Sequence, residues 1–133
     1  MAVVTLYHSV LSPFNEDSRK IKLHIFQHKR DGHIGAPYVS YRLLKDNKGS
    51  DDFISISVWD MNDLLHFMSR LTPVSIGNQH ERIEFRQDGD GYVIEVVKKG
   101  KSTQQMAFNT DEMQAILFSE QHIKKYLSMD VCD

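Results

Sequence analysis

The stretch that decides the fold runs from Gln79 to Lys101 and reads QHERIEFRQDGDGYVIEVVKKGK. Ile83 and Phe85 alternate with charged residues, which is the two-residue period of a strand that is buried on one face. The DGDG sequence that follows supplies residues that tolerate a positive φ, so the chain can reverse tightly there. Tyr92 to Val97 is then a second run, rich in β-branched residues. The stretch therefore predicts two antiparallel strands joined by a hairpin.

The chain continues from this hairpin into a third strand and a helix. After a turn at KGK, residues 99–101, the segment from Gln104 to Phe108 reads as a strand. Asn109 with Glu112 three residues later has the spacing of a helix capping box. Apolar residues then recur as far as Leu127, as one helical stripe or a pair of short helices. Residues 79–128 thus form a strand meander closed by a helix.

The first half of the chain, residues 1–72, predicts the same kind of unit. Strands are expected at 2–10, 20–28, 38–44 and 53–57. Ser57 with Asp60 three residues on indicates a helix cap, and an apolar stripe follows it. The two strand-to-helix joints match at constant spacing, with Ser57 corresponding to Asn109, which favours an internal duplication. Val74 to Asn78 is expected to link the halves, and its first three residues are a poor match to an opening strand.

The predicted fold class is α+β, with about four strands and a helix followed by three or four strands and a helix. Antiparallel sheets would pack on a helical layer in a single domain of 133 residues. The lone cysteine, Cys132, excludes an intramolecular disulfide and fits a reducing compartment. The sequence shows no secretory signal and no apolar run of the ~20 residues that a membrane helix needs. We therefore expect a cytoplasmic protein without a membrane partner.

The main candidate for function is the outward face of the second and third strands. The formal net charge is -2, but residues 19–48 carry eight lysines and arginines against two aspartates. Cations neutralise phosphates, and aromatic rings stack on unpaired bases. Strand alternation would bring together Lys20, Lys22, His24, Phe26, His28, Tyr38, Ser40 and Arg42. The pattern predicts a surface for single-stranded nucleic acid; the alternative is a solvated sheet face that covers a second layer or an oligomer contact.

Catalytic and metal sites are not predicted. His24 and His28 share a strand face but stand ~13 Å apart at the usual rise of a strand, too far for one zinc ion. The KKGKST sequence at 98–103 lacks the first glycine and the following helix of a phosphate loop. No nucleophile and base are paired by the pattern. We expect no enzyme activity, no metal and no cofactor.

Several segments resemble the Whirly family of single-stranded-DNA-binding proteins. DGDGY at 88–92 before an apolar strand is similar to that family's hairpin region, and EMQAI at 112–116 leading to KYL at 125–127 is similar to its final helix. FISIS at 53–57 entering MNDLL at 61–65 resembles its first strand-to-helix step. The single unit also resembles the DNA-binding domain of transcriptional positive cofactor four. The family's lysine-glycine-lysine motif lies in the first half, so no role is transferred to KGK at 99–101.

The resemblance implies two sheets splayed over a helical layer. It implies assembly into a homo-oligomer, a dimer or a tetramer, through the helices. It also implies DNA laid along sheet edges and across sheet faces. The chain is shorter than the plant members, which fits a bacterial or viral relative acting in a bacterial cell or a virus-infected host cell.

These observations combine into one hypothesis: non-enzymatic, largely sequence-independent binding of single-stranded DNA in replication, recombination, repair or transcription. Phosphate contacts are expected from Lys20, Lys22, Arg42, Arg82 and Arg86. Base stacking is expected from Phe26, Tyr38, Phe53 and Tyr92, with His24 and His28 beside them. There are two alternatives. The same surface could bind RNA, or the chain could be a small interaction or inhibitor domain that binds a partner protein. The hypothesis requires Lys22, Phe26, Tyr38 and Arg42 to share one uncovered side of the sheet.

Overall fold

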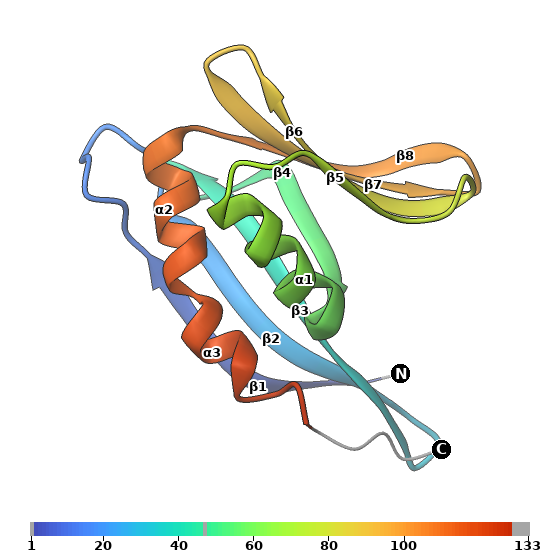
Figure 1. Cartoon of the computed structure of the whole chain (residues 1–133). Coiled ribbons are helices and arrows are strands. Elements are labelled where there is room, and N and C mark those ends of the chain that lie inside the picture. The colour runs from blue at the N-terminus through green and yellow to red at the C-terminus, as the bar shows by residue number, and fades with distance from the viewer. Residues whose placement is uncertain (1, 47, 129–133) are drawn as a thin grey trace.

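Each half of the chain is a run of four strands followed by helix (Figure 1) in the computed structural model, which describes residues 2–46 and 48–128. The first half comprises β1 (Ala2–Leu11), β2 (Ile21–Arg30), β3 (His33–Lys45), β4 (Lys48–Ser57) and α1 (Val58–Ser69). The second half comprises β5 (Val74–Gly77), β6 (Glu81–Asp88), β7 (Gly91–Lys98), β8 (Lys101–Phe108), α2 (Thr110–Phe118) and α3 (Glu120–Lys124). The predicted α+β order of two meander-plus-helix units is confirmed.

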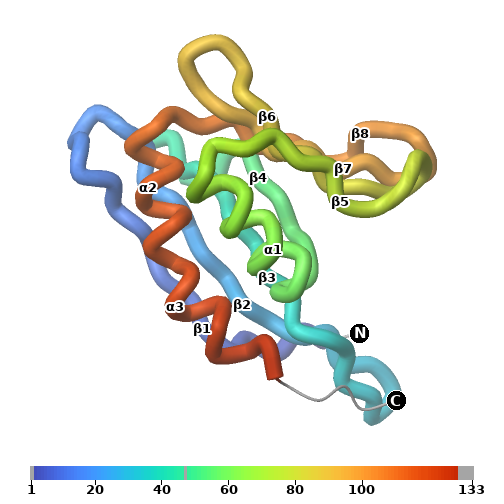
Figure 2. The backbone as a smooth tube through the Cα atoms, in the orientation of Figure 1, coloured from blue at the N-terminus to red at the C-terminus, as the bar shows by residue number. Residues whose placement is uncertain are grey.

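The strands form one antiparallel sheet in the order β1-β2-β3-β4-β8-β7-β6-β5. We call β1–β4 the first half-sheet and β5–β8 the second half-sheet. They meet at β4 and β8, where the pairing register consists of Phe53 opposite Gln105. Beyond this joint the second half-sheet turns away from the first, as the backbone tube shows (Figure 2). The sheet is therefore continuous in hydrogen bonding but splayed in space.

The core lies between the first half-sheet and the helices. Alternate residues of β2 and β3 are fully buried and face α1, α2 and α3, which all cover the same side of this half-sheet (Figure 1). These buried strand residues are Ile21, Leu23, Ile25, Val39, Tyr41 and Leu43. Fully burying one such apolar side chain contributes roughly 1.5–3 kcal/mol. The alternation of the sequence thus fixes which face of the half-sheet meets the helices.

Both predicted helix caps are confirmed. The Ser57 side chain accepts a hydrogen bond from the backbone N–H of Asp60 at the start of α1. At the start of α2, Asn109 Oδ1 accepts from Glu112 N at 2.8 Å, and Glu112 Oε1 accepts from Asn109 N at 2.9 Å, which completes a capping box. In the described part of the chain, no helix is long and apolar enough to span a membrane.

The prediction that Val74 to Asn78 only links the two halves is wrong. Residues 74–77 form β5, which pairs with β6 at the edge of the sheet, with Ile76 opposite Ile83. Four residues are too few to show a period in the sequence, and an edge strand needs only one partner. Gly77 ends the strand at a φ of +119°, where a Cβ would lie 2.3 Å from the carbonyl oxygen of Glu81. The glycine therefore permits the turn that returns the chain into β6.

Candidate nucleic-acid interface

The side of the first half-sheet that faces away from the helices carries the predicted surface. In the strand register, Lys22 stands opposite Arg42, and Phe26 stands opposite Tyr38. Arg42 in turn stands opposite Phe53 of β4. We call this side the outer face, defined by Lys22, His24, Phe26, His28, Tyr38, Ser40, Arg42, Phe53, Ser55 and Ser57. The helices pack on the opposite side of this half-sheet, and the second half-sheet comes close to the outer face at Tyr38, Ser55 and Ser57.

Four rings form a cluster at one end of the outer face. Phe26 lies at its centre, with ring centroids 4.9 Å from His24, 5.3 Å from His28 and 6.2 Å from Tyr38. His28 and Tyr38 also touch edge to face, at 6.0 Å. Phe26 is therefore only 8% exposed, because its strand neighbours and its cross-strand partner cover it. The expectation that the Phe26 ring offers a free stacking face is wrong; in this cluster the His28 ring is exposed, and the rings of His24 and Tyr38 are partly buried.

His24 lies against two residues of the neighbouring strand β1. Thr5 Oγ1 of β1 lies 2.8 Å from His24 Nε2, and His8 stands directly opposite in the β1–β2 register. Partial burial lowers the pKa of His24, and the charge of Lys22 and the nearby His8 lower it further. His24 is therefore mostly neutral near neutral pH and gains charge only in more acid solution.

Arg42 and Phe53 form a pair at the other end of the outer face. The guanidinium carbon lies 4.2 Å from the Phe53 ring centroid, within the range of a cation–π contact. Arg42 Nη1 donates to the carbonyl oxygen of Ser50 at 2.5 Å. These two contacts fix the guanidinium over the sheet. Arg42 is thus pre-positioned, while one side of the Phe53 ring is occupied.

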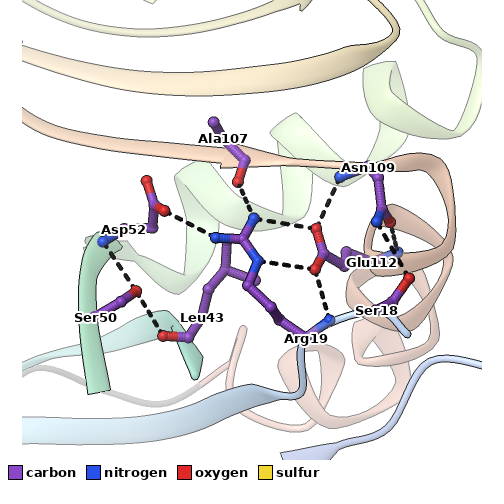
Figure 3. Close-up of polar contacts among 8 residues, drawn as sticks. All are labelled: Ser18, Arg19, Leu43, Ser50, Asp52, Ala107, Asn109 and Glu112. Atoms are coloured by element: carbon purple, nitrogen blue, oxygen red, sulfur yellow. Dashed lines mark hydrogen bonds and ion pairs between the residues drawn. The ribbon is translucent and has the colours of Figure 1, made fainter. Parts of the chain in front are cut away.

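The local excess of positive charge divides into free and engaged cations. Lys20, just before β2, and Lys22 are exposed and make no ion pair with any residue among 2–46 and 48–128. Arg19, by contrast, lies inside a polar network (Figure 3). Its guanidinium contacts the carboxylates of Glu112 and Asp52 at 3.0 and 2.9 Å. Arg19 therefore serves the fold and does not belong to the surface.

The Arg19 network joins the two halves of the chain (Figure 3). Nη2 of Arg19 donates to the carbonyl oxygen of Ala107, and its backbone N–H donates to Glu112 Oε2 at 2.9 Å. Asn109 Nδ2 donates to Ser18 Oγ at 3.1 Å. The Glu112 carboxylate is buried, and its hydrogen bond to Arg19 raises the pKa of the guanidinium above its ordinary value. The charge of Arg19 is consequently fixed at every working pH.

The predicted site residues of the second half-sheet do not extend the basic surface. Arg82 Nε lies 3.2 Å from Glu84, and Arg86 Nη1 lies 3.4 Å from Glu95 on the neighbouring strand. Two carboxylates thus neutralise the two arginines. The sequence showed Glu84 between them, but only the β6–β7 register brings Glu95 opposite Glu84.

Tyr92 lies away from the outer face. Its ring stacks on Phe85 at 5.8 Å and on Phe108 at 6.2 Å, and it packs against the hydrophobic core. The parity of β7 places it with the inward-facing residues. The structure therefore separates Tyr92 from the rings of the aromatic cluster, contrary to the expectation that they stack bases together.

A groove that the sequence did not indicate lies where the half-sheets diverge. It encloses about 230 Å³ and is lined by Tyr38 and Ser55 on one side and by Arg82, Glu81 and Lys98 on the other. These residues come from separate segments of the chain, so no local pattern marks them. Tyr38 belongs to both the aromatic cluster and the groove, which makes the two features continuous.

The outer face offers charge neutralisation and ring stacking. Among residues 2–46 and 48–128, no group of three or more histidine, cysteine, aspartate or glutamate side chains is arranged to hold a metal ion. The free cations Lys20 and Lys22 suit phosphate, and the rings of His28 and Tyr38 suit a flat base. Comparisons with protein-family models, curated proteins and solved structures give no match to this chain.

Proposed function

We propose that this protein binds single-stranded DNA through the outer face of the first half-sheet, as a non-enzymatic and largely sequence-independent binder. The observation that carries the proposal is the register of β2, β3 and β4. It sets the cations Lys22 and Arg42 and the rings of His28 and Tyr38 on one face, which the helices leave open. A strand that crosses the face along β2 and β3 can thus place phosphates near the cations and bases near the rings.

A single strand fits this face better than a duplex does. Duplex DNA hides the flat faces of its bases, whereas a single strand can turn them outward onto aromatic side chains. Each stacked base is worth roughly 1–3 kcal/mol. The outer face is a broad sheet surface, unlike the recognition helix that proteins commonly insert into a major groove. Stacking and phosphate contacts are also indifferent to base identity, which supports low sequence specificity.

The proposal includes Whirly-like ancestry and a homo-oligomer, both suggested by the order of the elements. The apolar stripes of α1 and α2 are buried in the core of one chain. The large apolar side chains that remain exposed on these helices are Trp59, at 38%, and Phe118, at 61%. A contact between copies through the helices would therefore use these two residues. Light scattering, which measures the mass of the protein in solution, tests for the homo-oligomer. The proposal also places the DNA-binding activity in the cytoplasm.

A fluorescence titration of labelled oligo-dT at increasing salt tests the binding proposal. We expect the affinity to fall with salt, with a slope of about 0.7 in log–log form for each phosphate that the protein neutralises. Matched RNA as a competitor determines whether the surface discriminates between the two sugars. No binding of oligo-dT, or binding that salt does not weaken, contradicts the proposal.

A further inference from the structure

The groove between the half-sheets is a second surface with a definite chemistry. It opens where β4 leaves β8, and its walls come from β3, β4 and the start of α1 on one side and from β5, β6 and β7 on the other. Its volume of about 230 Å³ is below the roughly 300–1,000 Å³ of pockets that hold drug-sized ligands. The groove therefore suits one flat ring and not a larger ligand.

The walls of the groove combine apolar surface with hydrogen-bond acceptors. Ile76 and Val97 line it with aliphatic carbon, as do Ile56, Ile83 and Val96. Asp60 and Glu81 line it as well, and the carboxylate of neither residue makes an ion pair within residues 2–46 and 48–128. An ionised carboxylate only accepts hydrogen bonds. A flat, partly apolar ligand that carries N–H donors complements this lining.

Two cations line the groove, Arg82 and Lys98, and a cation can contact the phosphate of a nucleotide. Arg82 is already engaged, because its Nε contacts Glu84 and its Nη1 donates to the carbonyl oxygen of Gln79 at 2.7 Å. Lys98 is exposed and makes no ion pair with the described residues. A phosphate at the rim therefore has Lys98 as its partner. Tyr38 leads from the aromatic cluster into the groove, so a strand on the outer face can pass a base into it.

We propose that the groove receives one unstacked base of the bound strand and prefers a base with an exocyclic amino group. Asp60 and Glu81 accept hydrogen bonds from that group, and Lys98 contacts a flanking phosphate. Cytosine presents its N4 amino group as a donor, whereas thymine presents a carbonyl oxygen at the same position. This inference rests on the proposed function and adds a modest base preference at one position of an otherwise sequence-tolerant surface.

Binding of oligo-dC and oligo-dT of equal length, at mildly alkaline pH where cytosine is unprotonated, tests the inference. We expect wild-type protein to bind oligo-dC about tenfold more tightly, the lower end of what a single hydrogen bond to a charged group provides. Glu81→Gln and Asp60→Asn should each reduce this ratio toward one. Asp63→Asn, which removes a carboxylate of α1 outside the groove, is the matched control and should keep the wild-type ratio. Melting curves of each variant confirm that the fold is intact.

The outcomes separate this inference from the proposed function. If wild-type protein binds neither oligonucleotide, the proposed function fails, and the inference fails with it. If both bind equally, or if the preference survives in both groove variants, the inference is overturned while the proposed function stands.

Discussion

Arg19 and Glu112 form the contact that ties the first half of the chain to the second: Arg19 Nε lies 3.0 Å from Glu112 Oε2. The same carboxylate closes the capping box of α2 through its bond from the backbone N–H of Asn109. The buried Glu112 side chain thus accepts hydrogen bonds from Arg19 in the loop before β2 and caps the start of α2, and in this way it connects the two halves of the chain. Its acceptor capacity is filled by groups from segments far apart in the sequence.

Replacing Arg19 should destabilise the protein strongly. Arg19→Met leaves the buried Glu112 carboxylate without its charged partner, which costs 3–5 kcal/mol when such a pair is fully buried. The Arg19 side chain is 36% exposed, so water weakens the effect and we expect a loss of about 2–3 kcal/mol in the free energy of unfolding. Urea denaturation followed by circular dichroism measures it.

Arg30→Met is the control for this prediction. Arg30 faces Asp31 at 3.8 Å with both side chains largely exposed, so its loss should change the free energy of unfolding by less than about 0.5 kcal/mol. Equal effects of the two substitutions would contradict the structural role of Arg19.

The buried hydroxyl pair of Tyr41 and Ser119 predicts an asymmetry between two substitutions. Ser119 Oγ donates to the carbonyl oxygen of Ile116, so Tyr41 is the donor to Ser119. Burial raises the pKa of Tyr41, which keeps its hydroxyl protonated. Tyr41→Phe should cost about 0.5–1.5 kcal/mol, whereas Ser119→Ala leaves a buried hydroxyl unpaired and should cost about 1–3 kcal/mol. The reverse order in denaturation experiments would contradict this hydrogen-bond direction.

Lys22→Gln should weaken DNA binding through charge alone. We expect the salt slope of oligo-dT affinity to fall by about 0.7, the value for one phosphate contact on a single strand. Lys124→Gln is the matched control, since Lys124 lies on α3 and pairs with Glu120 on the helical side. An unchanged slope in the Lys22 variant would remove this residue from the binding surface.

Phe26 and Tyr38 should respond differently although their rings lie 6.2 Å apart. Phe26 is the covered centre of the cluster, so Phe26→Ala should cost roughly 2–4 kcal/mol of stability. Tyr38 is partly buried and covers one side of Phe26, so Tyr38→Ala should cost less stability than Phe26→Ala, about 1 kcal/mol, and lower oligo-dT affinity roughly tenfold. Melting curves and titrations of both variants check the distinction. Unaltered affinity in the Tyr38 variant would count against stacking at this ring.

His24 should couple DNA binding to pH. The folded-state pKa of His24 lies below the ordinary value of about 6.5. As the pH falls from about 6.5 through the folded-state pKa, the unfolded chain takes up the proton more readily than the folded protein, so acidification over this range lowers the free energy of unfolding. A bound phosphate favours the charged imidazole and should raise the pKa. We therefore expect oligo-dT affinity to increase as the pH falls through this range, with part of the increase lost in His24→Gln. NMR titration of the His24 ring with and without oligonucleotide measures the shift directly; an identical pKa in both would contradict it.

Strand faces and helix caps were predictable because they depend on residues a few positions apart. The alternation of Ile21, Leu23 and Ile25 with Lys22 and His24 assigns the two faces of β2 without reference to any other strand. The Asn109–Glu112 box is local in the same sense. β5 was missed because four residues carry too little pattern, and its pairing with β6 decides its conformation.

The sequence by itself determined the two meander-plus-helix units, their caps and the sharing of one strand face by cationic and aromatic residues. Only the tertiary structure decided that Arg19 is engaged by Glu112, that Phe26 is covered, that Glu95 comes near Arg86, and that a groove opens beside Tyr38. The physical reason is the separation along the sequence of the residues that each interaction joins. Backbone periodicity and capping act within a turn or a strand, whereas ion pairing, burial and cavities depend on which distant segments the sheet order brings together.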